Sequence, residues 1–210
     1  MEKDKKRIAY DYIKQQIISG ALKSGAPIQE IQFSKLLGMS RSPIREALRE
    51  LEAEGLVVSY PARGSFVVEL TPYDIEEIFE LRNLLESWAL SRGFNRISES
   101  ELDRMEKTVD EAFESNNWDN NHQADLMLHR MIDKSSGSKR LLSIMNSLNA
   151  QIERISYCSA SNKERDAQTY QEHKDILNAI RERNLEKAKD ALDKHLQNVS
   201  KAAIETAQII

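Results

Sequence analysis

Residues 40–68 constrain the fold of this chain more than any other segment, because a helical apolar stripe, a row of arginines and a hairpin pattern follow one another there. Apolar residues recur at the spacing of one buried helix face: Ile44, Ala47, Leu48 and Leu51. Three arginines lie four residues apart and so line a neighbouring face: Arg41, Arg45 and Arg49. The segment therefore predicts a helix that packs on a core and presents guanidinium groups beside it.

Turn-forming residues set the limits of this helix. Ser42 and Pro43 are typical of a helix start, with Pro43 expected at the first helical position, where its missing N–H costs little. Gly55 is expected to end the helix. Two β-prone runs, 56–60 and 65–68, then flank a short turn and predict a hairpin.

The turn of this hairpin places a basic residue, Arg63, at its tip. A helix that presents arginines beside a basic hairpin is typical of a winged helix, which inserts the helix in the major groove of DNA and sets the hairpin beside the backbone. Helices over 6–19 and 30–37, with a turn at 23–27 between them, complete the pattern. We predict that residues 1–70 form a winged helix-turn-helix domain of three helices plus a β-hairpin wing.

The remainder, residues 71–210, is expected to be entirely helical. Thr71 can cap a helix that Pro72 opens, and Ser98 with Glu101 has the spacing of a capping box. The pattern predicts six helices that form an antiparallel bundle: 72–94, 98–116, 119–135, 139–159, 165–183 and 185–207. The fold class is thus mostly α, with a small β-hairpin in the first domain.

Charge and cysteine content restrict the classes of protein that this chain can represent. The net charge is −4, but basic residues slightly outnumber acidic ones in residues 1–70, where the DNA-binding pattern lies. Cys158 is the one cysteine, which fits a reduced, intracellular setting. We find no signal peptide and no apolar run long enough to span a membrane, so we expect a cytoplasmic protein without a membrane partner.

Three histidines share an unusual property, because His129, His173 and His195 all lie on apolar stripes of different helices. Asp125 precedes His129 by four residues, so the two side chains leave one helix face a turn apart. A divalent cation bound by all four groups would compensate the buried carboxylate. The alternative is that each histidine is a core residue that hydrogen-bonds to a backbone carbonyl, and the pattern alone leaves both possibilities open.

Taken together, these motifs resemble the GntR family of bacterial transcription regulators, and within it the FadR-type branch with an all-helical FCD domain. The first domain carries the family's signature in 36–48, followed by Glu54-Gly-Leu56 and Arg63-Gly64. The second carries Asp125-Leu-Met-Leu-His129, Glu172-His173 and His195, which are similar to the family's metal pattern in order and spacing. Six bundle helices resemble the shorter VanR-like subgroup.

The resemblance implies roles for individual residues. It implies DNA contacts from the predicted helix and wing, with the glycine at the wing tip allowing close approach to the minor groove: Arg41, Ser42, Arg45, Arg49, Arg63 and Gly64. It implies a divalent transition metal at Asp125, His129, His173 and His195, with zinc expected first and nickel or manganese as alternatives. Where some members carry a further DNA-contacting arginine, this chain has Ile31 or its neighbours Gln29 and Gln32.

We therefore predict a ligand-responsive transcription regulator, a repressor, that binds a palindromic operator in double-stranded DNA as a homodimer. The effector is expected to be a small organic acid, whose carboxylate Arg82 and Arg154 are candidates to bind. The competing hypothesis is a helical metal-dependent hydrolase or oxygenase with an appended DNA-binding domain. No carboxylate at motif spacing is an obvious general base, so we expect no enzyme activity and no catalytic residue.

Overall fold

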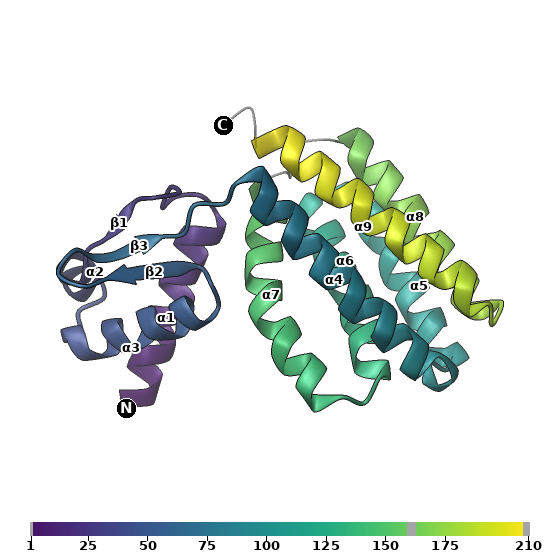
Figure 1. Cartoon of the computed structure of the whole chain (residues 1–210), viewed down its shortest axis with the longest axis horizontal. Coiled ribbons are helices and arrows are strands. Elements are labelled where there is room, and N and C mark those ends of the chain that lie inside the picture. The colour runs from purple at the N-terminus through teal and green to yellow at the C-terminus, as the bar shows by residue number, and fades with distance from the viewer. Residues whose placement is uncertain (1, 159–162, 208–210) are drawn as a thin grey trace. The chain divides into compact units, whose positions relative to one another are not determined.

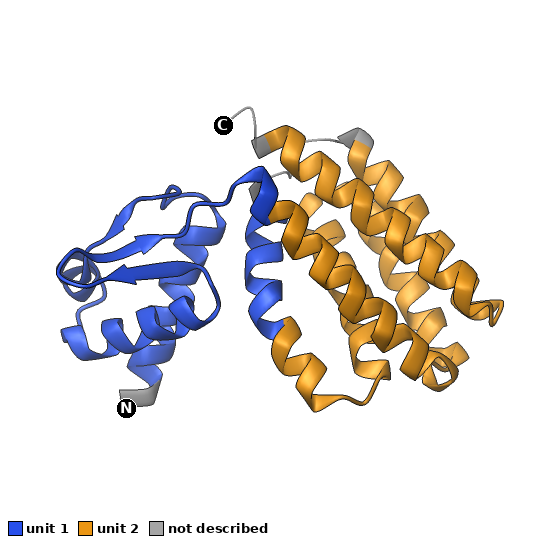
Figure 2. Ribbon diagram, viewed as in Figure 1, with its two compact units in different colours: residues 1–74, 146–158 blue, residues 75–145, 159–210 orange. Residues whose placement is uncertain are grey.

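The computed structural model describes residues 2–158 and 163–207, which form two compact units (Figures 1 and 2). Unit 1 comprises residues 1–74 together with 146–158, and unit 2 comprises 75–145 and 159–210. No described helix combines the length and the apolar character that crossing a membrane requires.

Unit 1 begins with three helices and a small sheet, as the sequence predicted for a winged helix. The elements, in chain order, are α1 (Glu2–Ile18), β1 (Pro27–Ile28), α2 (Glu30–Leu36), α3 (Arg41–Ala53), β2 (Val57–Tyr60) and β3 (Gly64–Val67). The sheet is antiparallel with the order β1-β3-β2, and the β2–β3 hairpin is the wing.

The first strand was not predicted from the sequence. We expected Pro27 to belong to a turn, but Pro27 and Ile28 pair with Phe66 and Ser65 of β3 and add a third strand to the hairpin. A two-residue strand is too short to show alternating hydrophobicity. Pro27 is tolerated because it lies at the first position of a short edge strand, where a missing N–H is cheap.

The core of unit 1 is built from helix faces that the sequence pattern marked out. On α3, Ile44, Ala47, Leu48 and Leu51 are all buried, which confirms the predicted stripe. They pack with the buried face of α1: Ala9, Ile13 and Ile17. Arg41, Arg45 and Arg49 are exposed beside that stripe, so α3 buries one face and leaves its arginine edge open.

The start of α3 differs from the prediction by two residues. Ser40 is the N-cap residue and Arg41 the first helical residue, so Pro43 occupies the third helical position rather than the first. Proline is tolerated there as well, because the first four N–H groups of a helix have no partner within it.

Unit 2 contains the remaining helices, except for residues 72–74 and 146–158, which belong to unit 1. These are α4 (Pro72–Gly93), a 3-10 turn η1 (Phe94–Arg96), α5 (Glu99–Glu114), α6 (Trp118–Ser135), α7 (Lys139–Cys158), α8 (Lys163–Arg181) and α9 (Leu185–Ala207). The six α-helices of the described residues after position 71 match the predicted six within about two residues. The last residue predicted for α7, position 159, lies outside the described residues.

Local side-chain caps explain why these helices begin where they do. Ser98 Oγ accepts from Glu101 N and the Glu101 carboxylate accepts from Ser98 N, which confirms the predicted capping box at α5. At α4, Thr71 Oγ1 accepts from Asp74 N, while the Asp74 carboxylate accepts from Thr71 N at 2.8 Å. Both starts are therefore fixed by the sequence within four residues.

A close approach of two helix ends shapes unit 2 near the end of α4. A side-chain carbon added at Gly93 would lie 2.0 Å from Ser135 Oγ and 2.4 Å from the Ser135 carbonyl carbon. Only glycine fits at this contact, because backbone atoms cannot rotate away as a side chain can. The contact sets the distance between α4 and α6, the two helices that carry much of the polar cluster described below.

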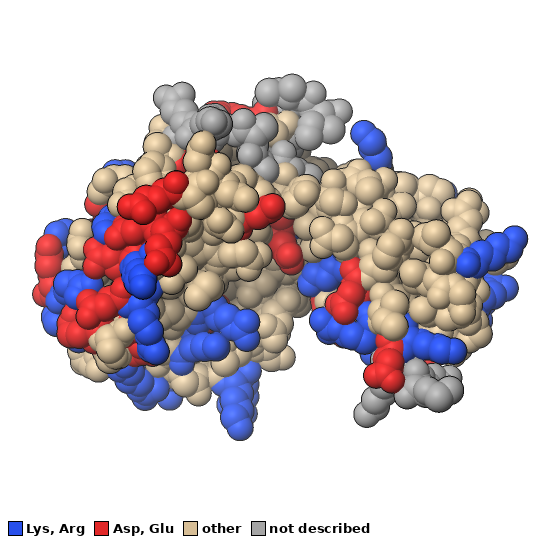
Figure 3. Space-filling view, turned by 180° about the vertical axis from the view of Figure 1, so that it is seen from behind, with Lys and Arg blue, Asp and Glu red and all other residues tan. Residues whose placement is uncertain are grey.

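Ion pairs join α5 to α8 on the surface of unit 2. Arg181 contacts Asp103 at 2.8 Å and Glu106 at 2.9 Å, and Lys174 contacts Glu106 at 2.5 Å and Asp110 at 3.1 Å. Figure 3 shows acidic and basic side chains interspersed over this unit. Ion pairs that solvent can reach contribute little individually, so the buried groups within the bundle are of more interest.

Residues 146–158, the larger part of α7, belong to unit 1 rather than to the bundle (Figure 2). Ala150 joins the apolar core of that unit. Gln151 Nε2 donates to the backbone oxygen of Glu54 at 3.3 Å, and Glu153 lies 3.9 Å from Lys14. One helix therefore supplies residues to both compact units.

Candidate functional site

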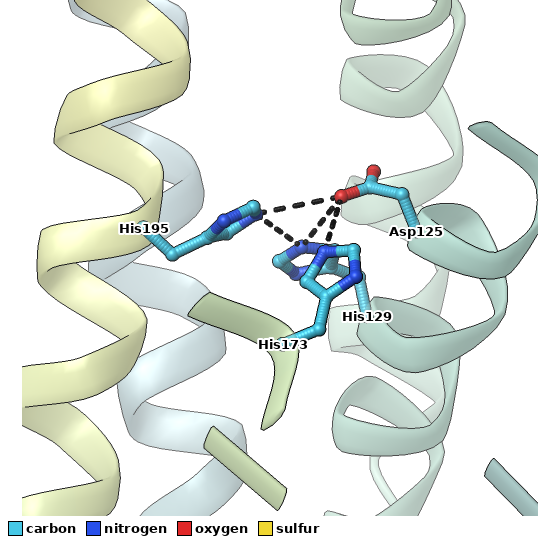
Figure 4. Close-up of side chains that lie close together, drawn as sticks. All are labelled: Asp125, His129, His173 and His195. Carbon is cyan, nitrogen blue, oxygen red and sulfur yellow. Dashed lines mark hydrogen bonds and ion pairs between the residues drawn. The ribbon is translucent and has the colours of Figure 1, made fainter. Parts of the chain in front are cut away.

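Four side chains from three helices of unit 2 converge at one point (Figure 4). Asp125 and His129 come from α6, His173 from α8 and His195 from α9. One ligand atom from each lies within 4.8 Å of the others, and the three histidines are buried. The structure thus brings together all four residues that the sequence predicted as metal ligands, and we call them the Asp–His cluster.

The Asp125 carboxylate lies at the centre of the Asp–His cluster. Its Oδ1 accepts a hydrogen bond from His173 Nε2 at 3.0 Å and lies 3.5 Å from His129 Nε2 and 3.4 Å from His195 Nε2. The Nε2 atoms of His129 and His195 are themselves 3.2 Å apart. All three imidazoles therefore direct the same ring nitrogen toward one carboxylate oxygen.

A buried carboxylate fixes the orientation of the first imidazole. Glu86 of α4 is fully buried, and its Oε2 accepts from His129 Nδ1 at 2.5 Å. Its other oxygen accepts from Arg82 Nε at 2.7 Å, one helical turn earlier. Because the Nδ1 proton of His129 is engaged by Glu86, the lone pair of the neutral ring lies on Nε2, which faces the cluster.

A second carboxylate supports His195 in the same way. Glu172 Oε2 accepts from His195 Nδ1 at 2.8 Å, and Arg165 binds both carboxylate oxygens of Glu172, at 2.7 and 2.8 Å. Asn198 donates to Glu172 Oε1 at 2.7 Å. Two chains of arginine, glutamate and histidine, one from Arg82 and one from Arg165, therefore converge on the cluster.

The carboxylates also set the charge that the Asp–His cluster can hold. Burial and the neighbouring Arg82 lower the pKa of His129, but Glu86 and Asp125 outweigh them and raise that pKa to about 9. Burial is the main influence on His173 and lowers its pKa to about 4. The acids that favour a proton at His129 would equally favour a cation at that position.

The donor set fits a divalent transition metal. One carboxylate oxygen and three imidazole nitrogens are ligands that zinc, nickel and manganese accept. Carboxylates behind ligating histidines are the usual outer partners of such sites, since they hold the ring and raise its basicity. A core histidine bonded to a backbone carbonyl, the alternative considered from sequence, is not what the structure shows at His129, His173 or His195.

The arginine edge of α3 forms the second group of predicted residues. Arg41 and Arg45 both bind Glu30, the first residue of α2, with contacts of 2.9 Å to its carboxylate. Arg49 is exposed one turn further along, and Ser42 Oγ donates to Glu46 at 3.4 Å. The structure therefore keeps the edge accessible, and the carboxylate of Glu30 is a partner that sequence analysis missed.

The wing carries the last two predicted DNA-contacting residues. The Arg63 guanidinium lies over the Tyr60 ring, 5.6 Å from its centroid, and so stays at the tip of the hairpin. Gly64 has a φ of 95°, a left-handed conformation that favours glycine, and no atom within 4 Å of the position of an added side-chain carbon. The tip is open to an approaching surface.

The two predicted effector contacts lie in different surroundings. Arg82 is buried, and its Nη2 makes no hydrogen bond with any described residue although its Nε binds Glu86. Arg154 belongs to unit 1, where its Nη2 donates to Ser24 Oγ at 2.8 Å. Arg82 is linked to the Asp–His cluster through Glu86, whereas Arg154 belongs to the other compact unit.

Sequence analysis also missed a third buried acid, Asp133, one turn after His129 on α6. Burial raises the pKa of Asp133 to about 7, with a further contribution from Glu86. Its spacing of four from His129 is the one signal that could have identified it. The opposite face of α6 instead lines a groove of about 910 Å³, with Met127 and Met131 among its residues.

Comparison with known proteins decides the class of this chain. Residues 5–67 match the family described as bacterial regulatory proteins, gntR family, and residues 77–198 match the FCD domain. The chain belongs to the GntR family. Because the FCD match covers more than half of the chain and the GntR match covers the winged helix, both predicted domains have their counterparts in this family.

Individual GntR-family relatives extend the likeness over nearly the whole chain. The HTH-type transcriptional regulator YdhC of Bacillus subtilis is 28% identical over 193 residues, which cover 90% of this chain and 86% of YdhC. The HTH-type transcriptional repressor RspR of Escherichia coli is 24% identical and covers 95% of this chain and 89% of RspR. The solved structure of E. coli McbR/YncC, 22% identical, superposes with a TM-score of 0.78 over 98% of this chain and 99% of that one.

Membership of the GntR family resolves the choice between regulator and enzyme. The family consists of DNA-binding transcription regulators, so the hypothesis of a metal-dependent hydrolase or oxygenase is set aside. This chain is a DNA-binding transcription regulator with an FCD domain for ligand sensing, and the Asp–His cluster lies within that domain.

Proposed function

We propose that this GntR-family regulator represses transcription by binding a palindromic operator as a homodimer, and that a small organic acid controls its binding through a metal-containing FCD domain. The convergence of Asp125 with three histidines carries the sensor part of the proposal. The open arginine edge of α3 carries the DNA-binding part. Assignment to the VanR-like subgroup stays a prediction.

DNA contact is assigned to α3 and the wing. Arg45 and Arg41 would reach base edges and phosphates of the major groove, with Ser42 and Arg49 beside them on the same helix. Arg63 and Gly64 would approach the neighbouring minor groove. The exposure of these residues supports the assignment, because none of them needs to leave a packed core to meet a duplex. A regulator of chromosomal transcription would act in the cytoplasm.

Dimerisation is assigned to an apolar stripe on α4. Leu81, Leu84 and Trp88 are spaced to share one helix face, and their exposed fractions are 43%, 68% and 48%. Exposed apolar residues gathered on one helix indicate a surface that another chain covers. A second copy of this chain is the occupant that operator binding requires, because a palindrome presents two identical half-sites.

The Asp–His cluster would hold one divalent metal ion, with zinc the first candidate. When bound, the metal supplies positive charge and coordination positions that attract a carboxylate or hydroxyl group. Arg82 contributes from the protein, because its Nη2 has donors available and its Nε is already fixed by Glu86. An anionic effector would thus meet a guanidinium held in place beforehand. Effector contact by Arg154 stays a prediction without structural support.

Operator selection tests the DNA-binding part of the proposal. Wild-type protein is used to enrich duplexes from a random pool, and its affinity for the enriched duplex is compared with that for a scrambled one. Arg45→Ala is expected to lower affinity for the enriched duplex by about 1–3 kcal/mol if it makes a bidentate base contact. Equal wild-type affinity for both duplexes would refute the proposed function, and metal content of protein purified without a nickel column tests the sensor part.

A further inference from the structure

Glu30 of α2 binds two arginines of the α3 edge, and DNA contact by those arginines does not by itself require a carboxylate beside them. Its Oε2 accepts from Arg41 Nη2 at 2.9 Å and from Arg41 Nε at 3.2 Å. Both of its oxygens accept from Arg45 Nε at 2.9 Å. A single carboxylate therefore binds two arginines that lie one turn apart on α3.

The contacts leave both terminal nitrogens of Arg45 and one terminal nitrogen of Arg41, Nη1, unbound by Glu30. Arg45 engages Glu30 through Nε alone, and neither of its terminal nitrogens hydrogen-bonds to a described residue. The side chains of Arg41 and Arg45 remain 51% and 55% exposed, whereas that of Glu30 is 24% exposed. Glu30 thus holds Nε of both groups and also Nη2 of Arg41, and it leaves the two terminal nitrogens of Arg45 free of its own carboxylate. Arg49 has no ion pair among the described residues.

We propose that Glu30 is a specificity-determining residue, which orients Arg41 and Arg45 for base contact and at the same time lowers their attraction for DNA of any sequence. This inference rests on the proposed role of the α3 arginines in operator binding. Glu30 would act on DNA only through Arg41 and Arg45, and it would not itself contact a base.

Orienting the arginines and partly neutralising their charge would both raise the ratio of operator affinity to affinity for other DNA. A bidentate arginine contact to guanine needs two terminal N–H groups in one plane, and restraint at Nε limits the planes that Arg45 can adopt. Contacts to phosphates are less demanding and depend on net charge. A carboxylate beside two arginines cancels about half of their charge, so it weakens phosphate contacts at every sequence while it preserves the oriented donors.

Glu30 is ionised under ordinary conditions. Burial raises the pKa of its carboxyl group, but hydrogen bonds and charge from Arg45 and Arg41 outweigh burial and lower it below the usual value. The simplest alternative is that the ion pairs of Glu30 only stabilise the packing of α2 against α3. Exposed ion pairs stabilise folded proteins only slightly, so the absence of this pair should alter DNA binding more than folding.

The experiment compares Glu30→Gln with a matched control, Glu46→Gln, in the full-length protein. Glu46 is an exposed acid next to Arg45 in sequence, and it makes no ion pair with a described residue. Both variants remove one negative charge near the same edge. Affinities for the duplex enriched by wild type and for its scrambled version are measured over a range of salt concentrations, and thermal unfolding confirms that each variant is folded.

Glu30→Gln is expected to bind the scrambled duplex more tightly, and the ratio of enriched to scrambled affinity should fall about fivefold or more. Its binding should also depend more steeply on salt, by about 0.9 in log–log slope for each phosphate newly engaged. Glu46→Gln should keep the wild-type ratio. The proposal is overturned if Glu30→Gln keeps that ratio, or if both variants lower it equally.

The same measurements distinguish failure of the proposed DNA-binding role of the α3 arginines from failure of the proposed role of Glu30. If Arg45→Ala loses preference for the enriched duplex while Glu30→Gln keeps it, the role of the α3 arginines stands and the role of Glu30 falls. If the wild-type protein shows no preference for the enriched duplex, both proposals are refuted. Loss of preference in Arg45→Ala and in Glu30→Gln, but not in Glu46→Gln, supports both.

Discussion

Replacing Glu86 by glutamine tests the buried chain from Arg82 to the Asp–His cluster. The glutamine side chain has nearly the same size, so packing in α4 is preserved while the negative charge is removed. Glu86 is fully buried and accepts from Arg82 at 2.7 Å and from His129 at 2.5 Å. The variant therefore leaves a buried guanidinium without its nearest counter-charge.

The expected loss of stability follows from that burial. Removing one partner of a buried ion pair typically costs about 3–5 kcal/mol. The amide oxygen of glutamine can still accept one hydrogen bond, so we expect a value near 3 kcal/mol for the metal-free protein. A loss of that size lowers the melting temperature of a domain of this length by roughly 10 °C. Metal affinity should also fall by about 10–100-fold, because His129 loses the group that orients it.

Two further variants provide controls. Glu172→Gln removes the equivalent carboxylate behind His195, but its partner Arg165 is 14% exposed and can reach solvent, so stability should fall less while metal affinity falls similarly. Combining Glu86→Gln with Arg82→Met removes both charges of the buried pair and should recover most of the stability without recovering metal affinity.

Denaturant unfolding of metal-free protein and competition with a chromophoric chelator measure the two effects. The reasoning fails if Glu86→Gln unfolds at the wild-type denaturant concentration, because Arg82 would then have no need of its counter-charge. It fails equally if the double variant is less stable than Glu86→Gln alone. Unchanged metal affinity in Glu86→Gln would show that the orientation of His129 does not depend on this carboxylate.

Three other expectations test separate parts of the structure. His173→Ala combined with His195→Ala should abolish stoichiometric metal binding, and full metal content by elemental analysis would exclude these residues as ligands. Leu84→Glu should yield a folded monomer, so an unchanged mass by light scattering would place the dimer contact elsewhere. Gly93→Ala should destabilise the protein by about 1–3 kcal/mol in denaturant unfolding, since the added carbon meets Ser135; wild-type stability would show that the helix ends separate at no cost.

Much of the fold could be predicted because its determinants are local. The stripe from Ile44 to Leu51 repeats within one helix, and the capping box at Ser98 lies within four residues. Asp125 and His129 were paired by the same rule of helical spacing. The apolar stripes made a metal site that includes His173 and His195 one of two open possibilities, and the resemblance to a family favoured it, since no local pattern brings three helices to one point.

The groups missed from the sequence share a different property. Glu86 meets His129 across 43 positions, and Glu30 meets Arg45 across 15, so each acid looks like an ordinary surface residue in its own helix. Arg82 was expected to face a ligand, and its pairing with Glu86 one turn later is equally compatible with an exposed helix surface. Only tertiary packing decides which acids and bases become partners.

Helix α6 carries different tasks on its two sides. Asp125 and His129 face the Asp–His cluster, whereas Met127 and Met131 line the groove toward α5. One residue inserted ahead of Asp125 would rotate everything after it by about 100°, and both sides would lose their alignment at once. We therefore expect this segment to tolerate substitutions but not insertions or deletions, and we expect length changes to be tolerated in the loops that flank the helix.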